Sequence, residues 1–100
     1  MDKAFKSISQ QLKLTVEKYD SENLLGISIN AFKKKQDLEY ACKVFDKLKE
    51  SKFNNTCRTA RYYLGLCYEG GVRCSQNLNE AKKWYKSAEY LGHLENRQIY

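Results

Sequence analysis

The stretch Ala60–His93, ARYYLGLCYEGGVRCSQNLNEAKKWYKSAEYLGH, decides the fold class of this chain. Its first part carries an apolar stripe at steps of four, formed by Ala60, Leu64 and Tyr68. Its second part carries a stripe at steps of three and four, formed by Leu78, Ala81, Tyr85 and Ala88. Both spacings are typical of one face of an α-helix. Because Gly70 and Gly71 tolerate the left-handed backbone that ends many helices, the stretch predicts two helices, about 57–69 and 78–91, joined by a glycine turn.

Polar residues mark where the second of these helices begins, and a glycine marks where it is expected to end. Asn77, followed three positions later by Glu80, resembles a capping box, in which each side chain bonds the backbone N–H of the other residue. Gly92 is expected to stop the helix. The last residues, from Leu94 to Tyr100, then read as the first turns of another helix.

Three more helices are predicted before residue 57. The first begins after Asp2 and has a stripe at steps of three and four, formed by Phe5, Ile8, Leu12, Val16 and Tyr19. Asp20 and Ser21 are expected to interrupt it and to begin a second helix, which fades into Lys33–Lys35. The third is capped by Asp37 and carries the stripe Leu38, Ala41, Phe45 and Leu48, after which 51–56 reads as a polar turn.

These helices repeat along the chain. The stripe that begins at Leu38 has the spacing of the stripe that begins at Leu78, about 40 positions later, and two-helix units of this period are typical of an α-solenoid. Gly26 and Gly65 also correspond, and a residue without a Cβ lets a neighbouring helix approach closely. We therefore expect a capping helix (1–20), a first repeat (21–56), a second repeat (57–92) and the start of a further helix or a C-terminal cap (93–100).

The second repeat resembles the Sel-1-like repeat, a relative of the tetratricopeptide repeat. The matching positions are Ala60, Leu64, Gly65, Tyr68, Gly71, Ala81, Trp84, Tyr85, Ser87, Ala88 and Gly92. The loop departs from the family pattern at Arg73 and Cys74, where a glycine and a valine are usual, and a looser copy over 21–52 keeps Leu25, Gly26, Ala41 and Phe45. The resemblance implies an all-α, right-handed superhelix of helix pairs that binds other proteins as an adaptor or scaffold, without catalysis.

The resemblance also implies where a partner would bind. In tetratricopeptide-like stacks, one side of the first helix of each pair packs on its partner helix, here Ala60, Leu64 and Tyr68, and the opposite side lines a concave groove. The groove side of the predicted first helices carries Asn23, Ile27, Asn30, Thr59, Tyr62, Leu66 and Glu69. Their mixture of apolar and polar side chains is typical of a peptide-docking surface. The alternative, that they pack against the adjacent first helix, stays open.

The cysteines and the histidine do not form a recognisable site. Cys42, Cys57, Cys67 and Cys74 contain no C-x-x-C pair, and His93 is the one histidine, so we expect four reduced thiols, no metal and no cofactor. In secreted members of the family, disulfide cysteines would fall at Leu48 with Arg61 and at Ala88 with Arg97, and none of these is cysteine. Reduced thiols and the lack of a signal-peptide pattern predict a cytoplasmic protein.

The charge pattern and the motifs disfavour several classes of function. The net charge of +6 fits an alternative in which a basic surface docks nucleic acid or anionic lipid, but the charges are mostly interspersed and we do not expect nucleic acid as the partner. No glycine-rich phosphate loop is present. Cys67 and His93 are a conceivable nucleophile and base, yet a lone thiol in a repeat core is usually a packing residue, so we expect no enzyme. No apolar run is long enough to span a bilayer.

The end of the chain is expected to be poorly covered. A solenoid repeat buries its apolar face only against a neighbour, and about three repeats are needed for stability. The residues without a neighbour would be Leu91, Leu94, Ile99 and Tyr100. We therefore predict either self-association through this end or a chain that is a piece of a longer protein.

Overall fold

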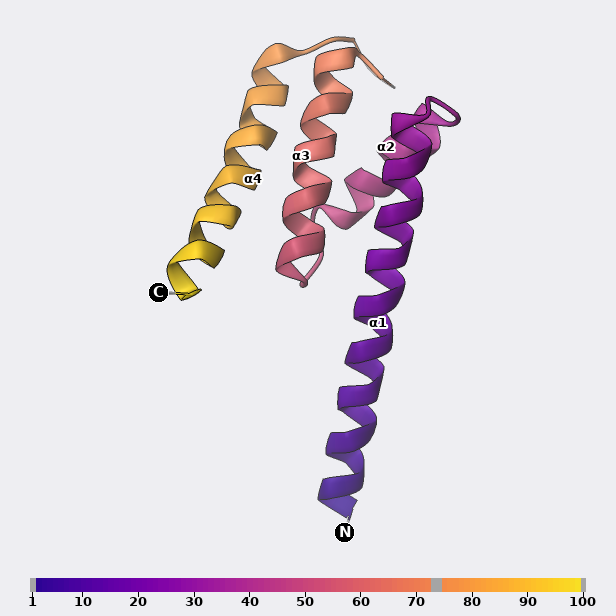
Figure 1. The fold of residues 1–100 in the computed structure, drawn as a ribbon, viewed down its shortest axis with the longest axis vertical. Coiled ribbons are helices and arrows are strands. Elements are labelled where there is room, and N and C mark those ends of the chain that lie inside the picture. Colours follow the sequence, from indigo (N-terminus) through magenta and orange to yellow (C-terminus); the bar gives the residue numbers. More distant parts are fainter. Residues whose placement is uncertain (1, 73–74, 100) are drawn as a thin grey trace.

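The computed structural model describes residues 2–72 and 75–99, with side chains described within 9–72 and 75–92. Four α-helices and no strand occur in these residues: α1 (Asp2–Lys33), α2 (Leu38–Leu48), α3 (Asn54–Gly70) and α4 (Leu78–Ile99). The predicted all-α class is therefore confirmed. The helix α3 packs against both α2 and α4, whereas α1 packs mainly against α2 and less extensively against α3. The N-terminal half of α1 projects beyond the other three helices (Figure 1).

Local capping signals placed three helix ends correctly. The carboxylate of Asp37 accepts a hydrogen bond of 3.0 Å from the backbone N–H of Tyr40, at the start of α2. The side chain of Asn77 accepts from the N–H of Glu80 at 3.1 Å. At the C-terminal end of α3, Gly71 has φ 70°, in the left-handed region, and ends the helix. These ends depend only on residues close in sequence, which is why the sequence predicts them.

Two predicted helix breaks are wrong. One continuous helix passes through Asp20 and Ser21, and α4 continues through Gly92 to Ile99, so five helices and part of a sixth become four. Polar residues and glycine in a helix interior cost only about 0.5–1 kcal/mol each, which flanking helical residues can outweigh. The break predicted between the lysine run and Asp37 is present at 34–37, where Lys35 has φ 55°. The turn predicted for 51–56 is shorter, because α3 begins at Asn54.

The core lies where α1, α2 and α3 meet. Its buried apolar residues come from all three helices: Leu25, Ala41, Cys42, Val44, Phe45, Leu48, Ala60, Leu64 and Cys67. The ring of Phe45 is fully buried, stacks on Tyr63 at 5.1 Å between centroids and meets the edge of Phe32 at 5.8 Å. Ala60 and Leu64 therefore face α1 and α2, and not only the partner helix α4 as predicted.

The two corresponding glycines differ in their surroundings. A Cβ on Gly65 would lie 2.6 Å from Cε1 of Tyr85, so this glycine does allow α4 to approach α3 closely, as predicted. A Cβ on Gly26 would meet nothing within 4 Å, so no helix packs there and the prediction is wrong at that position. Gly26 is exposed on α1.

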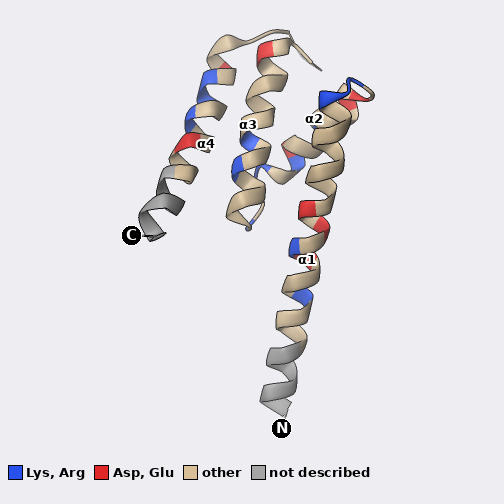
Figure 2. Ribbon diagram, in the orientation of Figure 1, with Lys and Arg blue, Asp and Glu red and all other residues tan. Residues whose placement is uncertain are grey.

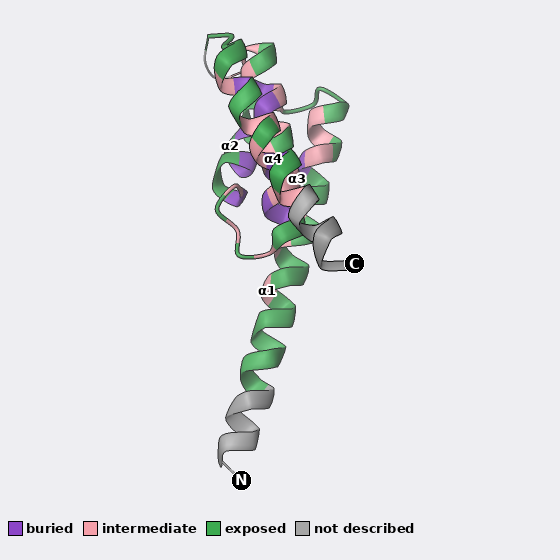
Figure 3. Ribbon diagram, turned by 90° about the vertical axis from the view of Figure 1, so that its left-hand side faces the viewer, coloured by how far each residue is buried: buried purple, intermediate pink, exposed green. Residues whose placement is uncertain are grey.

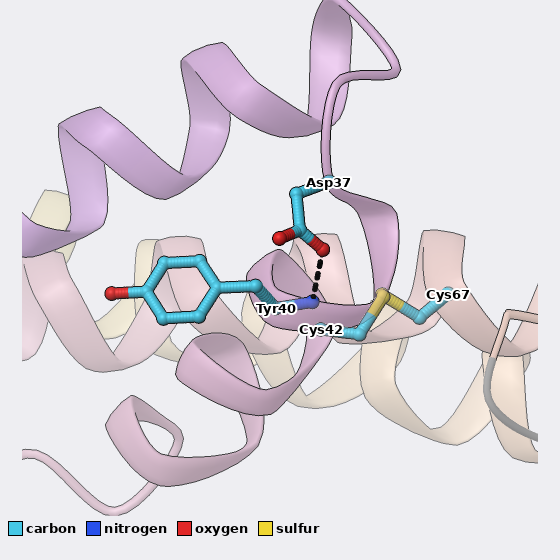
Figure 4. The surroundings of a disulfide bond; sticks show 4 residues. All are labelled: Asp37, Tyr40, Cys42 and Cys67. Atoms are coloured by element: carbon cyan, nitrogen blue, oxygen red, sulfur yellow. Dashed lines mark hydrogen bonds between the residues drawn. A yellow bond between two sulfur atoms is a disulfide. The ribbon is translucent and has the colours of Figure 1, made fainter.

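A disulfide joins Cys42 of α2 to Cys67 of α3, with a Cα–Cα distance of 6.3 Å (Figure 4). This bond overturns the expectation of four reduced thiols, and it removes the support that the cysteines gave to a reducing compartment. Cys57 is a free thiol, buried, and its Sγ donates to the backbone oxygen of Lys49 at 3.0 Å. Cys74 lies outside the described residues. The pairing follows from the packing of α2 on α3, which no local spacing reveals.

Residues 9–20, which belong to the segment predicted as an N-terminal cap (1–20), contribute no buried residue to the core. None of the residues 9–20 is buried, and all of them except Glu17, which is half-buried, are exposed (Figure 3). An ion pair between Glu17 and Lys52 links residues 9–20 to the turn between α2 and α3. Of the C-terminal residues predicted to be uncovered, Leu91 is half-buried on α4, and Leu94, Ile99 and Tyr100 lie outside the described side chains.

Candidate functional site

Four of the seven predicted groove residues line one open cavity between α3 and α4. The cavity has a volume of about 760 Å³. The residues from α3 are Arg58, Thr59, Tyr62, Leu66 and Glu69, and those from α4 are Tyr85, Ala88, Glu89 and Gly92. We call this surface the α3–α4 groove. The other three predicted residues, Asn23, Ile27 and Asn30, are exposed on α1 and do not line it.

Aromatic rings form the floor of the α3–α4 groove. The ring of Tyr62 lies 5.6 Å from that of Tyr85 and meets the edge of Tyr63 at 5.4 Å. Tyr63, and not Tyr62, contacts the α1 residue Phe32, at 5.7 Å. The contact between α3 and α1 is therefore made by the neighbour of Tyr62, while Tyr62 itself keeps 47% of its surface exposed.

A hydrogen bond across the groove fixes its floor to its rim. The hydroxyl of Tyr85 donates to the carboxylate of Glu69, on the opposite helix. Burial, and then this bond to Glu69, raise the pKa of Tyr85 well above its usual value. Because the phenol stays protonated throughout the physiological pH range, the donor is always present.

Arginines hold the two walls of the groove together. Arg61 donates from Nη1 to Oγ of Ser87 on α4 at 2.7 Å and from Nε to the backbone oxygen of Lys49 at 2.9 Å. Arg58 lies over Gly92, where an added Cβ would stand 3.2 Å from Nη1. The glycine that was expected to end α4 therefore makes room for an arginine of α3.

The balance of acidic and basic side chains at the groove differs from that of the whole chain. The rim carries the two carboxylates of Glu69 and Glu89 against the one guanidinium of Arg58, whereas the whole chain has a net charge of +6. Elsewhere, basic and acidic positions are interspersed along the helices (Figure 2). The groove is therefore a locally acidic, apolar-floored site on a basic protein.

The sequence predicts residues of α3 that line the groove, but none of the α4 residues that line it. The α3 residues are predicted because they lie opposite the core stripe of their helix. Tyr85 and Ala88 belong to the apolar stripe of α4, which predicts packing and not a groove. The signal that could have found them is Gly65, since a glycine on the facing helix leaves room for the Tyr85 ring at the helix contact.

Nothing among the described residues points to a metal or a nucleophile. No group of three or more histidine, cysteine, aspartate or glutamate side chains lies close enough to hold a metal ion within that part of the chain. Cys67 is in the disulfide, so the conceivable Cys67–His93 pair has no free thiol. Burial raises the pKa of the Cys57 thiol, which is the opposite of activation.

The remaining observations concern membrane-spanning helices and similarity to known proteins. No helix within the described residues is both long and apolar enough to cross a membrane. Comparison of the chain with protein-family models, with curated proteins and with solved structures finds no match. The resemblance to the Sel-1-like repeat therefore rests on the residues of this sequence alone.

Proposed function

We propose that this chain is a non-catalytic protein-interaction module whose α3–α4 groove binds an apolar segment of another protein. The observation that carries the proposal is the groove itself. Its volume of about 760 Å³ lies within the range of ligand pockets, roughly 300–1,000 Å³. Exposed Tyr62 stands at its floor, and tyrosine is enriched among the residues that dominate binding energies at protein interfaces.

The rim defines the chemistry of the segment that would bind. An apolar side chain of the partner would replace water over Tyr62, Leu66 and Ala88. A neighbouring lysine or arginine of the partner would then meet Glu69 and Glu89. The proposed partner is thus a peptide segment in which an apolar or aromatic residue lies next to a basic one.

The repeat architecture belongs to the same proposal. The pairs α1–α2 and α3–α4 are each in contact, and α3 joins the second pair to the first through α2 and α1. This order of contacts supports two helix pairs stacked as in a right-handed, Sel-1-like solenoid acting as an adaptor. A cytoplasmic location belongs to the same proposal.

The alternative, docking of nucleic acid or anionic lipid, would use a different surface. Carboxylates of Glu69 and Glu89 at the rim repel phosphate, so this ligand would bind the exposed Lys33–Lys35 run instead. Binding to phosphates weakens steeply between low and moderate salt. Binding of an apolar anchor in the groove would change little over the same range.

A peptide selection with matched tyrosine variants tests the proposal. A phage-displayed library of random peptides is selected on the immobilised chain, and enriched peptides are titrated against Tyr62→Ala and Tyr40→Ala. Tyr40 lies on α2 and is exposed to a similar extent, 45% against 47% for Tyr62. We expect Tyr62→Ala to weaken binding by about 1–2 kcal/mol, and Tyr40→Ala to leave it unchanged. Failure to enrich any peptide, or equal affinities for the two variants, would contradict the proposal.

A further inference from the structure

One face of α1 carries large apolar side chains that no other helix covers. Leu12, Val16, Tyr19 and Ile27 are each more than half exposed. Together with Asn23, they lie within about 40° of one direction at 100° per residue. We call these five residues the outer stripe. The core-facing residues of the same helix, Leu25, Ser28 and Phe32, lie on the opposite side.

The outer stripe belongs to a helix that lacks tertiary support over much of its length. Residues 9–16 contain no buried or half-buried position, and Figure 1 shows this part of α1 clear of the other helices. Most of the stability of a helix in a protein comes from packing its apolar face. The stripe therefore has the composition and the spacing of a surface that packs against another helix.

We propose that the occupant is the α1 helix of a second copy of this chain, packed antiparallel about a two-fold axis between Val16 and Glu17. An antiparallel pair of identical helices sets residues at equal distances before and after the axis opposite each other. Leu12 lies four and a half positions before this axis and Tyr19 lies two and a half positions after it. The two side chains are therefore offset by about two residues, or roughly 3 Å along the helices, and can pack together in both halves of the pair. The body formed by α2, α3 and α4 lies on the opposite side of α1, so the second helix meets no obstacle there.

The charges beside the outer stripe select this axis. Lys13 and Asp20, both exposed, lie on the same flank of the stripe, three and a half positions before and after the axis. Each Lys13 therefore faces an Asp20 of the second copy, which forms two ion pairs. On the other flank, Glu22 faces the neutral Gln11.

The neighbouring registers are disfavoured by the same two residues. Moving the axis three and a half positions toward the N-terminus sets Lys13 opposite Lys13, and moving it three and a half positions toward the C-terminus sets Asp20 opposite Asp20. Like charges in this position destabilise a helix pair, and such flanking charges set orientation and register in coiled coils. Charge complementarity thus specifies both the second copy as the partner and its alignment.

Sedimentation equilibrium of the full chain, from about 1 µM to 1 mM, covers the range of weak interfaces and tests the proposal. We expect a monomer–dimer equilibrium. Val16→Lys would place two ammonium groups together at the axis and should weaken dimerisation at least tenfold. Leu14→Lys is the matched control, because Leu14 is also exposed on α1 but lies on the opposite side from the stripe. A monomer at all concentrations, or equal dimerisation by the two variants, would overturn the proposal.

A separate experiment tests the antiparallel alignment of the two α1 helices. Lys13→Glu and Asp20→Lys should each weaken the dimer, and the double variant should restore it, since the ion pairs are then reversed and not lost. Mixing Leu12→Cys with Tyr19→Cys chains under mild oxidation should give the mixed disulfide dimer. Preferential linking of Leu12→Cys chains to one another would indicate a parallel pair and would overturn the proposed arrangement.

Discussion

Replacing Gly65 with alanine tests whether the close contact between α3 and α4 shapes the groove. The new Cβ would lie 2.6 Å from Cε1 and 2.7 Å from Cδ1 of Tyr85, closer than carbon atoms can approach. The ring cannot simply move away, because it lies against Tyr62 and its hydroxyl bonds Glu69. The substitution must therefore push α4 outward or break the bond to Glu69.

The expected change in the free energy of unfolding combines two costs and one gain. Overpacking typically costs about 1–3 kcal/mol. Loss of a hydrogen bond to a charged group costs about 1.5–3 kcal/mol. Alanine gains about 1 kcal/mol over glycine in a helix interior. The net effect is a loss of about 2 kcal/mol, which corresponds to a fall in Tm of roughly 8–16 °C for a domain of this size.

Gly26→Ala is the matched control, because it makes the same change in a helix where nothing lies within 4 Å of the new Cβ. Only the helix propensity then changes, so this variant should be stabilised by about 0.5–1 kcal/mol. Thermal unfolding followed by circular dichroism measures both variants. Stabilisation of Gly65→Ala to the same extent as Gly26→Ala would refute the argument that Tyr85 packs tightly on Gly65.

Two further predictions concern the disulfide and Tyr85 at the floor of the groove. The Cys42–Cys67 bond spans 25 positions in the sequence, so reduction or Cys42→Ser should lower the free energy of unfolding by about 3–4 kcal/mol in urea titrations; unchanged midpoints with and without reductant would contradict the bond. The raised pKa of Tyr85 means that its contribution to stability is complete below about pH 10 and is lost as the pH rises further. Thermal melts at pH 8 and pH 11 should therefore show a larger alkaline loss for the wild-type chain than for Tyr85→Phe, and equal losses would exclude this role.

The sequence predicts those parts of the fold that depend on neighbours in the chain. Asp37, Asn77 and Gly71 mark helix ends because each acts through backbone groups a few residues away. Asp20 and Gly92 carry the same kind of signal, but their cost is small and the helices run on through them. A local signal of about 1 kcal/mol is decisive only where the flanking residues do not favour a helix.

Features made by residues far apart in the sequence were predicted only in part. The pairing of Cys42 with Cys67 requires knowing that α2 crosses α3 at those positions. The α3–α4 groove was half predicted, since helical periodicity identifies the outward face of α3 and cannot show that Tyr85 of α4 closes it. Gly26 and Gly65 occupy equivalent positions in the repeat, yet only one has a neighbouring helix against it.

The disulfide makes the two walls of the groove unequal in how they can move. It links α2 to α3 close to the point where α3 ends, and the covalently closed loop contains Tyr62 and Leu66. The helix α4 lies outside this loop, and within the described residues α3 is the helix on which it packs. Hydrogen exchange should therefore resolve two cooperative units, a cross-linked α2–α3 unit and a less protected α4. A binding segment would contact a rigid wall formed by α3 and a more mobile wall formed by α4. The width of the groove would therefore change through movement of α4.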